Sequence, residues 1–236
     1  TRMHKPGTLR QTLLALLIFG AAFGYVEAAV VVYLRELTQP AIHHIRPSQS
    51  ASDLFPILTP AELGLYPNLI HTLKIELGRE AATLLMLAAV ALAIGKGRTE
   101  SAAAFVMAFG VWDIAFYSFL RLFIHWPASL LTWDLLFLLP VPWAGPVLAP
   151  VIVSLSMILA GSLVLWRESR DRPVSLASLH WLGVLVGGFI IVLSFTWNFR
   201  GLIAGGIPLH FNWPLFAIGE ALGLGAFFAA LRAVTR

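Results

Sequence analysis

Residues 13–34 read LLALLIFGAAFGYVEAAVVVYL, an apolar run of 22 residues that contains a single charge, Glu27. A helix that crosses a bilayer needs about 20 apolar residues, whereas the apolar part of a cleavable signal peptide has about 7–15. The run is therefore too long for a signal peptide and predicts a retained first membrane helix.

The composition of the chain extends this prediction to the whole sequence. Of its 236 residues, 58% are hydrophobic and 12% are charged, and the mean hydropathy is +0.83. Soluble domains carry about 25% charged residues, so much of this apolar surface must face lipid. We predict an all-α polytopic membrane protein, a single transmembrane domain over residues 1–236 with short outer interfacial helices. Its six transmembrane helices are expected at 12–34, 69–95, 101–124, 144–166, 178–197 and 213–232.

The charged residues predict the orientation of these helices. The inner segments, with the N-terminus inside, hold ten of the 16 basic residues, against three in the clearly external loops. Because cytoplasmic loops carry an excess of Lys and Arg, both termini are expected in the cytoplasm of a plasma (bacterial inner) membrane. The ten are Arg2, Lys5, Arg10, Lys96, Arg98, Arg167, Arg170, Arg172, Arg232 and Arg236, and the three are Arg35, Arg46 and Arg200.

Two outer segments carry local structure signals. Thr59-Pro60-Ala61-Glu62 is a capping box with proline at the first helical position, so a short helix is expected to start there and to end at Pro67. The apolar segment 126–143 is too short for two crossings, and its three tryptophans suit headgroup depth. It predicts an interfacial or re-entrant helix around 129–139, ended by Pro140.

Five acidic residues fall inside the predicted spans. A charge at the bilayer centre costs roughly 2.5–3.5 kcal/mol on insertion scales, so such residues face a protein interior or a watery cavity and mark candidate sites. All five lie between the midplane and the predicted outer boundary. They are Glu27, Glu76, Glu80, Asp113 and Glu220.

Helical spacing gathers several of these acids onto shared faces. Glu76, Arg79 and Glu80 form one polar stripe on the second span, and Tyr117 follows Asp113 on the third. We expect the acids of the first three spans to converge on Arg79 in one site that opens outward. Arg79 is also expected to bond an acid of another helix, because Glu76 alone leaves donors unused. The predicted polar intramembrane site comprises Glu27, Glu76, Arg79, Glu80, Asp113, Tyr117 and Glu220.

The role of this site stays open between three alternatives. A buried ion network can simply fix helix register, as polar residues between membrane helices do. Arg79 and Lys74 offset only two of the five acids, so the rest are protonated, hydrated, paired elsewhere or bound to a cation. Proton or metal binding is therefore the second alternative, and a water-lined substrate path is the third.

Three histidines near the outer boundary are candidate metal ligands, namely His71, His125 and His210. Imidazole together with carboxylate suits zinc, copper or iron, and two facing histidines would suit a haem. A metal ion or haem is therefore the cofactor considered. The chain has no cysteine, which excludes disulfides, thiolate zinc sites and cysteine-held iron–sulfur clusters.

Several motifs carry a resemblance across most of the chain. They are Gly24-Tyr25-Val26-Glu27-Ala28-Ala29, the stretch from Glu76 to Ala82, Val111-Trp112-Asp113, Leu131-Thr132-Trp133-Asp134 and Pro140-Val141-Pro142-Trp143. With these motifs the chain resembles an uncharacterised group of bacterial six-span integral membrane proteins. The resemblance implies the six-span architecture and no activity.

Three functions remain in competition. The absence of a soluble domain or nucleotide motif favours a non-catalytic integral subunit of a larger membrane protein complex, with the lipid bilayer and other membrane subunits as partners. The alternative is a small transporter or channel for protons or metal cations, favoured by the buried acids. The second alternative is an intramembrane enzyme that depends on a metal or haem. No basic stripe or binding motif predicts a nucleic-acid partner.

Overall fold

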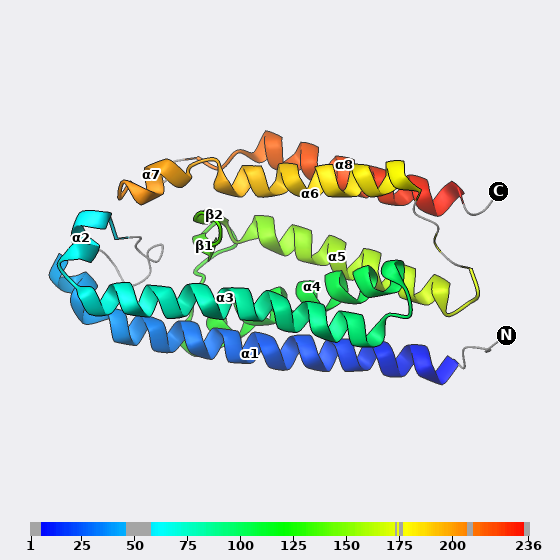
Figure 1. The fold of residues 1–236 in the computed structure, drawn as a ribbon, viewed down its shortest axis with the longest axis horizontal. Helices are drawn as coiled ribbons and strands as arrows, with labels where there is room; N and C mark the ends of the chain where they lie inside the picture. The colour runs from blue at the N-terminus through cyan, green and yellow to red at the C-terminus, as the bar shows by residue number, and fades with distance from the viewer. Residues whose placement is uncertain (1–5, 46–57, 173, 175–176, 207–209, 234–236) are drawn as a thin grey trace.

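The computed structural model of the chain is a bundle of long helices with one small hairpin (Figure 1). It describes residues 6–45, 58–172, 174, 177–206 and 210–233. Six described helices are long and apolar enough to cross a membrane, which confirms the predicted six-helix, all-α membrane fold. They are α1 (Pro6–Ile45), α3 (Pro67–Ile94), α4 (Arg98–Ile124), α5 (Leu148–Glu168), α6 (Ser178–Thr196) and α8 (Trp213–Ala233).

Helix α1 continues well beyond the predicted end at residue 34. Its 40 residues correspond to about 60 Å, twice the thickness of a hydrocarbon core of about 30 Å. The apolar run ends before Arg35, but a helix that continues outside lipid needs no apolar side chains. The hydropathy pattern therefore predicted only the part of α1 that is long and apolar enough to cross the membrane. The Thr38 hydroxyl donates to the Leu34 carbonyl at 2.7 Å, and the helix passes Pro40.

Helix α4 is the centre of the bundle. In the most apolar 18-residue stretch of α4, 56% of the residues are buried, whereas this share is at most 33% in the other five spans. Small residues permit this close packing: an added Cβ at Gly24 of α1 would lie 2.7 Å from the Trp112 carbonyl of α4. A Cβ at Gly110 of α4 would lie 2.5 Å from the Ser154 carbonyl of α5. Helices α1 and α5 therefore pack backbone to backbone against α4.

Helices α6 and α8 form a pair of their own, side by side in Figure 1. Glycine permits this contact too, since an added Cβ at Gly187 would lie 2.6 Å from the Gly223 backbone nitrogen and 2.7 Å from the Gly219 carbonyl. The adjacent Gly188 has open space around it. One face of α6 is therefore fixed against α8, whereas the face that carries Gly188 borders a cavity between this pair and the α4–α5 pair.

The segment 126–143 does not form the predicted helix around 129–139. It contains strand β1 (Trp133–Phe137), which pairs in an antiparallel way with β2 (Trp143–Pro146). Pro140 and Pro142 lie in the turn between the strands, and neither can donate a backbone hydrogen bond that would continue a helix. Non-helical backbone is tolerated at membrane depth where protein buries it, and the hairpin lies between the helices. Residues 144–146, which were predicted to begin the fourth span, belong to β2, and the fourth span begins later, at Leu148.

Two short helices lie outside the spans, α2 (Pro60–Gly64) and α7 (Phe199–Ile203). The predicted capping box at α2 is confirmed: the Thr59 N–H donates to Glu62 Oε2 at 2.7 Å, and the Glu62 N–H donates to Thr59 Oγ1 at 3.3 Å. Pro67 does not end α2, which stops at Gly64, but begins α3. Proline suits that position because the first helical N–H has no partner within the helix.

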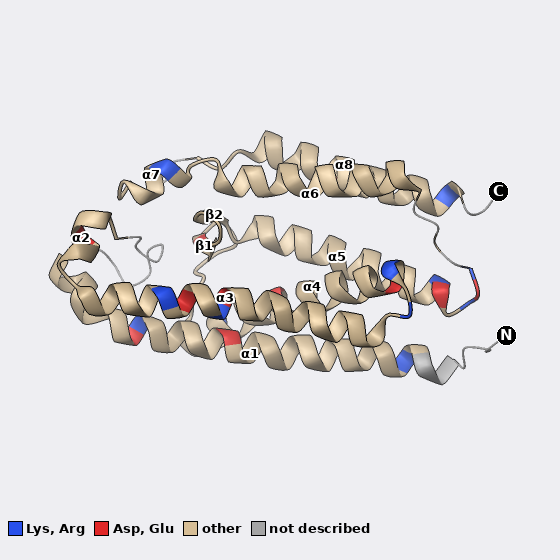
Figure 2. Cartoon of the chain, viewed as in Figure 1, with Lys and Arg blue, Asp and Glu red and all other residues tan. Residues whose placement is uncertain are grey.

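The bundle has two distinct ends. The first described turn of α1, the α3–α4 turn, the α5–α6 connection and the last turn of α8 share one end, which we call the terminal end (Figure 1). Helix α2, the turn of the hairpin and α7 lie toward the other end, which we call the hairpin end. Figure 2 shows basic residues gathered in the turns of the terminal end. Arg2, Lys5, Arg46 and Arg236, which entered the orientation prediction, lie outside the described residues.

Candidate functional site

Arg79 of α3 is the hub of a buried ion network between two helices. Its Nε donates to Glu76 Oε2 at 2.9 Å, and its Nη1 donates to Glu27 of α1. The expected bond between Arg79 and an acid of another helix is therefore present. Thr83 adds a hydroxyl 3.4 Å from both Glu27 Oε2 and Arg79 Nη1. Glu27 and Thr83 are only 7% and 2% exposed, whereas Arg79 and Glu76 are half-buried.

Glu80 follows Arg79 but faces a different partner. It is 5% exposed, and the backbone N–H of Leu138 in the hairpin donates to its two carboxylate oxygens at 3.1 and 3.0 Å. Glu80 is the fourteenth of the 28 residues of α3, so this bond holds the hairpin turn near the middle of that helix. The carboxylate also satisfies a backbone donor that a hairpin at this depth would otherwise leave unpaired.

Two further buried acids complete the cluster. Asp113 of α4 accepts the Ser154 hydroxyl of α5 at 2.8 Å, and Asp134 of β1 accepts the Tyr117 hydroxyl of α4 at 2.8 Å. The two aspartates are 7% and 6% exposed. Asp134 also accepts the Leu135 N–H at 2.8 Å. Each aspartate therefore has a neutral donor, and neither makes a described ion pair within salt-bridge distance.

A small cavity of about 20 Å³ joins these groups. Such a volume suffices for about one water molecule. Its polar walls come from α1, α3, α4 and the hairpin. The structure therefore brings together acids from the first three spans, as the sequence predicted. The polar residues of the wall are Glu27, Arg79, Glu80, Thr83, Asp113, Tyr117 and Asp134. Glu76 reaches the same group through its bond to Arg79.

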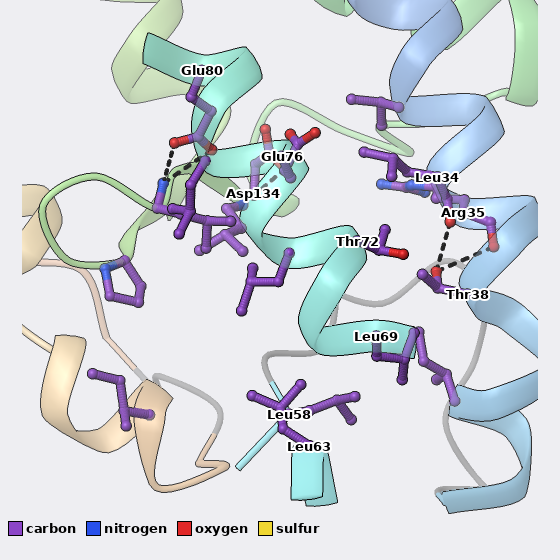
Figure 3. Close-up of a pocket in the computed structure, with 18 of the residues that line it drawn as sticks. Leu34, Arg35, Thr38, Leu58, Leu63, Leu69, Thr72, Glu76, Glu80 and Asp134 are labelled. Carbon is purple, nitrogen blue, oxygen red and sulfur yellow. Dashed lines mark hydrogen bonds between the residues drawn. The ribbon is translucent and has the colours of Figure 1, made fainter. Parts of the chain in front are cut away.

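Two larger cavities adjoin this cluster from opposite ends of the bundle. The first, of about 360 Å³, runs from Ile42 and Leu63 at the hairpin end to Glu76, Glu80 and Asp134 (Figure 3). The second, of about 380 Å³, lies between the α4–α5 and α6–α8 pairs. It reaches Asp113 at the cluster and Thr99 at the terminal end. The carboxyl cluster therefore lies between two spaces that extend to different ends.

Two charged residues that line the first cavity were missed by sequence reasoning. Arg35 was assigned to an external loop, but it lies on α1, lines the first cavity and stacks on the Trp126 ring at 4.6 Å. Asp134 was assigned to an interfacial segment, but it is buried beside Tyr117. Arg35 directly follows the first apolar run, and Asp134 lies in the hairpin, which the sequence pattern did not predict.

Glu220 does not join the cluster. It accepts the Ser156 hydroxyl of α5 and lines the second cavity from α8. Its inclusion in one shared site was therefore wrong, because its depth along α8 matched the other acids while its helix packs on α6. Depth alone does not say which neighbour a side chain meets.

The predicted metal site at His71, His125 and His210 has no basis in the described part of the chain. All three side chains are exposed, and His125 ends α4 in a left-handed conformation with φ 56°. Among the described residues no group of three or more histidine, aspartate or glutamate side chains could hold a metal ion. The residues that could meet a cation are therefore the carboxyl groups of the cluster, one or two at a time.

Comparisons of the chain with protein-family models, with curated proteins and with solved structures found no match.

Proposed function

We propose that the protein is a small multi-pass membrane transporter that exchanges protons or other cations at its buried carboxyl cluster. The observation that carries the proposal is the placement of that cluster between two cavities that extend to opposite ends of the bundle. A transporter needs such a central site, which each side reaches in turn.

The cavities meet the cluster through shared residues. Glu80 and Asp134 line both the first cavity and the small central one. Asp113 lines both the central cavity and the second one. A proton or cation that enters at the hairpin end therefore meets Glu80 first and Asp113 last.

Aromatic residues close the passage between the two larger cavities. Phe137 of β1 lies with its ring centroid 6.3 Å from that of Trp112 and 5.5 Å from that of Trp143. Phe137 lines the second cavity but not the first. The hairpin thus acts as the barrier that a transporter requires to prevent a continuous leak.

The charge balance of the cluster favours cation binding. Five acids and two guanidinium groups line or join it, which leaves three negative charges without an arginine. Burying unpaired carboxylates is costly, so protons or other cations must neutralise them. The acids are Glu27, Glu76, Glu80, Asp113 and Asp134, and the guanidinium groups belong to Arg35 and Arg79.

Glu80 links this charge to the barrier, since its carboxylate accepts the Leu138 N–H of the hairpin. Neutralising Glu80 weakens a charge-assisted hydrogen bond, which is about twice as strong as a neutral one. Cation or proton binding at Glu80 therefore loosens the hairpin. In this way the binding of a cation at Glu80 is coupled to opening of the barrier that the hairpin forms.

Transport by the purified protein tests the proposal. We expect proton flux into vesicles that contain the wild-type protein, driven by a gradient of protons or of an exchanging cation and followed with an internal pH dye. Glu80→Gln should lower the initial rate at least tenfold, because the glutamine keeps the shape but cannot carry the charge. Glu36→Gln is the matched control, since Glu36 is exposed on α1. Equal rates in the wild type, in Glu80→Gln and in empty vesicles would refute the proposal.

The proposal places both termini in the cytoplasm of a bacterial inner membrane. The basic residues of the terminal end support this orientation, because cytoplasmic loops carry the excess of Lys and Arg. Since the chain has no cysteine, single cysteines can report topology. We expect Ala61→Cys in α2 to react with an impermeant maleimide in intact cells, and Lys96→Cys in the α3–α4 turn to react only after lysis. The opposite pattern would reverse the orientation.

A role as a subunit of a larger membrane complex stays a prediction, as does an enzymatic role. Native mass measurement after extraction in mild detergent separates the first from the transporter proposal. A stoichiometric partner, together with no flux by the isolated chain, would favour the subunit.

A further inference from the structure

We infer that the first cavity binds an organic ammonium ion with an apolar body, and that its ammonium group lies against Glu80. This inference rests on the proposed function and names the class of its cargo. It combines the walls of the cavity, the distribution of its acids and the lack of a metal ligand set among the described residues.

Apolar side chains form most of the wall of the first cavity. Its volume of about 360 Å³ falls in the usual range of small-molecule sites, about 300–1,000 Å³. A bare metal ion or a proton gains nothing from such walls, whereas an alkyl or aryl body buries apolar surface at about 25 cal/mol per Å². The apolar lining includes Val31, Leu34, Leu69, Leu73, Leu77 and Leu120.

The acids of the cavity lie on one side of it, across from Arg35 (Figure 3). Glu76 is held by Arg79, and Asp134 by Tyr117. The described hydrogen bonds of Glu80, by contrast, come from hairpin backbone. Glu80 is therefore the acid with the most unused capacity for a new cation.

The geometry of the acids suits an ammonium group better than a metal ion. Calcium takes six to eight oxygen ligands and magnesium an octahedron, and no such group occurs among the described side chains. An ammonium group has three donors and needs only two or three separate acceptors. Glu80, with Glu76 one turn earlier on the same face of α3, supplies them.

An ammonium group and a proton compete for Glu80, so binding should weaken as the pH falls. Charged and titratable groups from every element around Glu80 take part in this balance. They are Glu27 and Arg35 from α1, Glu76 and Arg79 from α3, Asp113 and Tyr117 from α4, and Asp134 from the hairpin. Binding of one ammonium ion should release up to one proton.

Titration calorimetry on the full chain in detergent tests the inference, with 4-phenylbutylammonium chloride as the probe. We expect saturable binding of this amine, at least tenfold tighter than that of the neutral 4-phenylbutan-1-ol. Binding should weaken as the pH is lowered. Equal affinity for the amine and the alcohol, or no binding of either, would overturn the inference.

Two pairs of variants place the site. Glu80→Gln should weaken amine binding at least tenfold, whereas Glu36→Gln on the exposed face of α1 should not change it. Leu63→Trp fills the cavity from α2 without removing a charge and should also weaken binding. Leu65→Trp is its control, because Leu65 is 73% exposed. Equal affinity in all four variants would overturn the placement.

The inference and the proposed function can fail separately. Flux of protons or metal ions by vesicles, without binding of the amine, would refute the ammonium cargo and leave a transporter. Binding of the amine without any flux would support the ammonium site and refute transport.

Discussion

Arg79→Leu is expected to lower the free energy of unfolding by about 3–5 kcal/mol, the range found when one partner of a buried ion pair is removed. Arg79 bonds both Glu76 and Glu27, and Glu27 is 7% exposed. Without the guanidinium group, the buried Glu27 keeps only the Thr83 hydroxyl as a donor, and the half-buried Glu76 keeps no described donor. The loss of unfolding free energy arises mainly because these carboxylates lose their positive partner, and less because a contact is lost.

Titration with SDS, followed by tryptophan fluorescence, measures this effect on the purified protein. Glu80→Gln is the comparison, and it should cost less, because glutamine can still accept the Leu138 N–H. The triple variant Glu27→Gln, Glu76→Gln, Arg79→Leu should be more stable than Arg79→Leu alone, since it also removes the two carboxylates that Arg79 paired. An Arg79→Leu protein as stable as the wild type would show that Arg79 does not neutralise the cluster.

Gly24→Leu is expected to separate α1 from α4 and to destabilise the protein by about 1–3 kcal/mol or more, as overpacking does. An added Cβ at Gly24 would lie 2.7 Å from both the Trp112 carbonyl and the Ala115 Cβ, and 2.9 Å from the Phe116 nitrogen. Two of these atoms belong to the backbone, so a side-chain rotation cannot relieve the clash. Glu27 lies one turn further along the same helix, and its bond to Arg79 should lengthen or break.

Gly78→Leu is the matched control, because a Cβ at Gly78 meets nothing within 4 Å. It should leave the unfolding free energy within about 0.5 kcal/mol of the wild type, as surface substitutions do. Equal stability of the Gly24 and Gly78 variants would argue against close packing of α1 on α4.

The sequence alone determined the features that depend on neighbours along the chain. The six membrane helices followed from apolar runs, because the thickness of a bilayer sets the length of a span. The capping box at Thr59 followed from residues three apart. The polar stripe of Glu76, Arg79 and Glu80 followed from helical spacing, and so did the requirement that Arg79 find an acid on another helix.

Only the tertiary structure decided the features that depend on which elements meet. The hairpin at 133–146 exists because helices bury it and Glu80 satisfies its backbone, and neither condition can be read from an apolar, proline-rich segment. The same packing brings Arg35 and Asp134 to the first cavity. The packing places Glu220 beside Ser156 instead, although the predicted depth of Glu220 in the membrane matched that of the other acids. The depth of a residue in the membrane follows from its position along a span, but the partner of a buried charge depends on which helices lie next to each other.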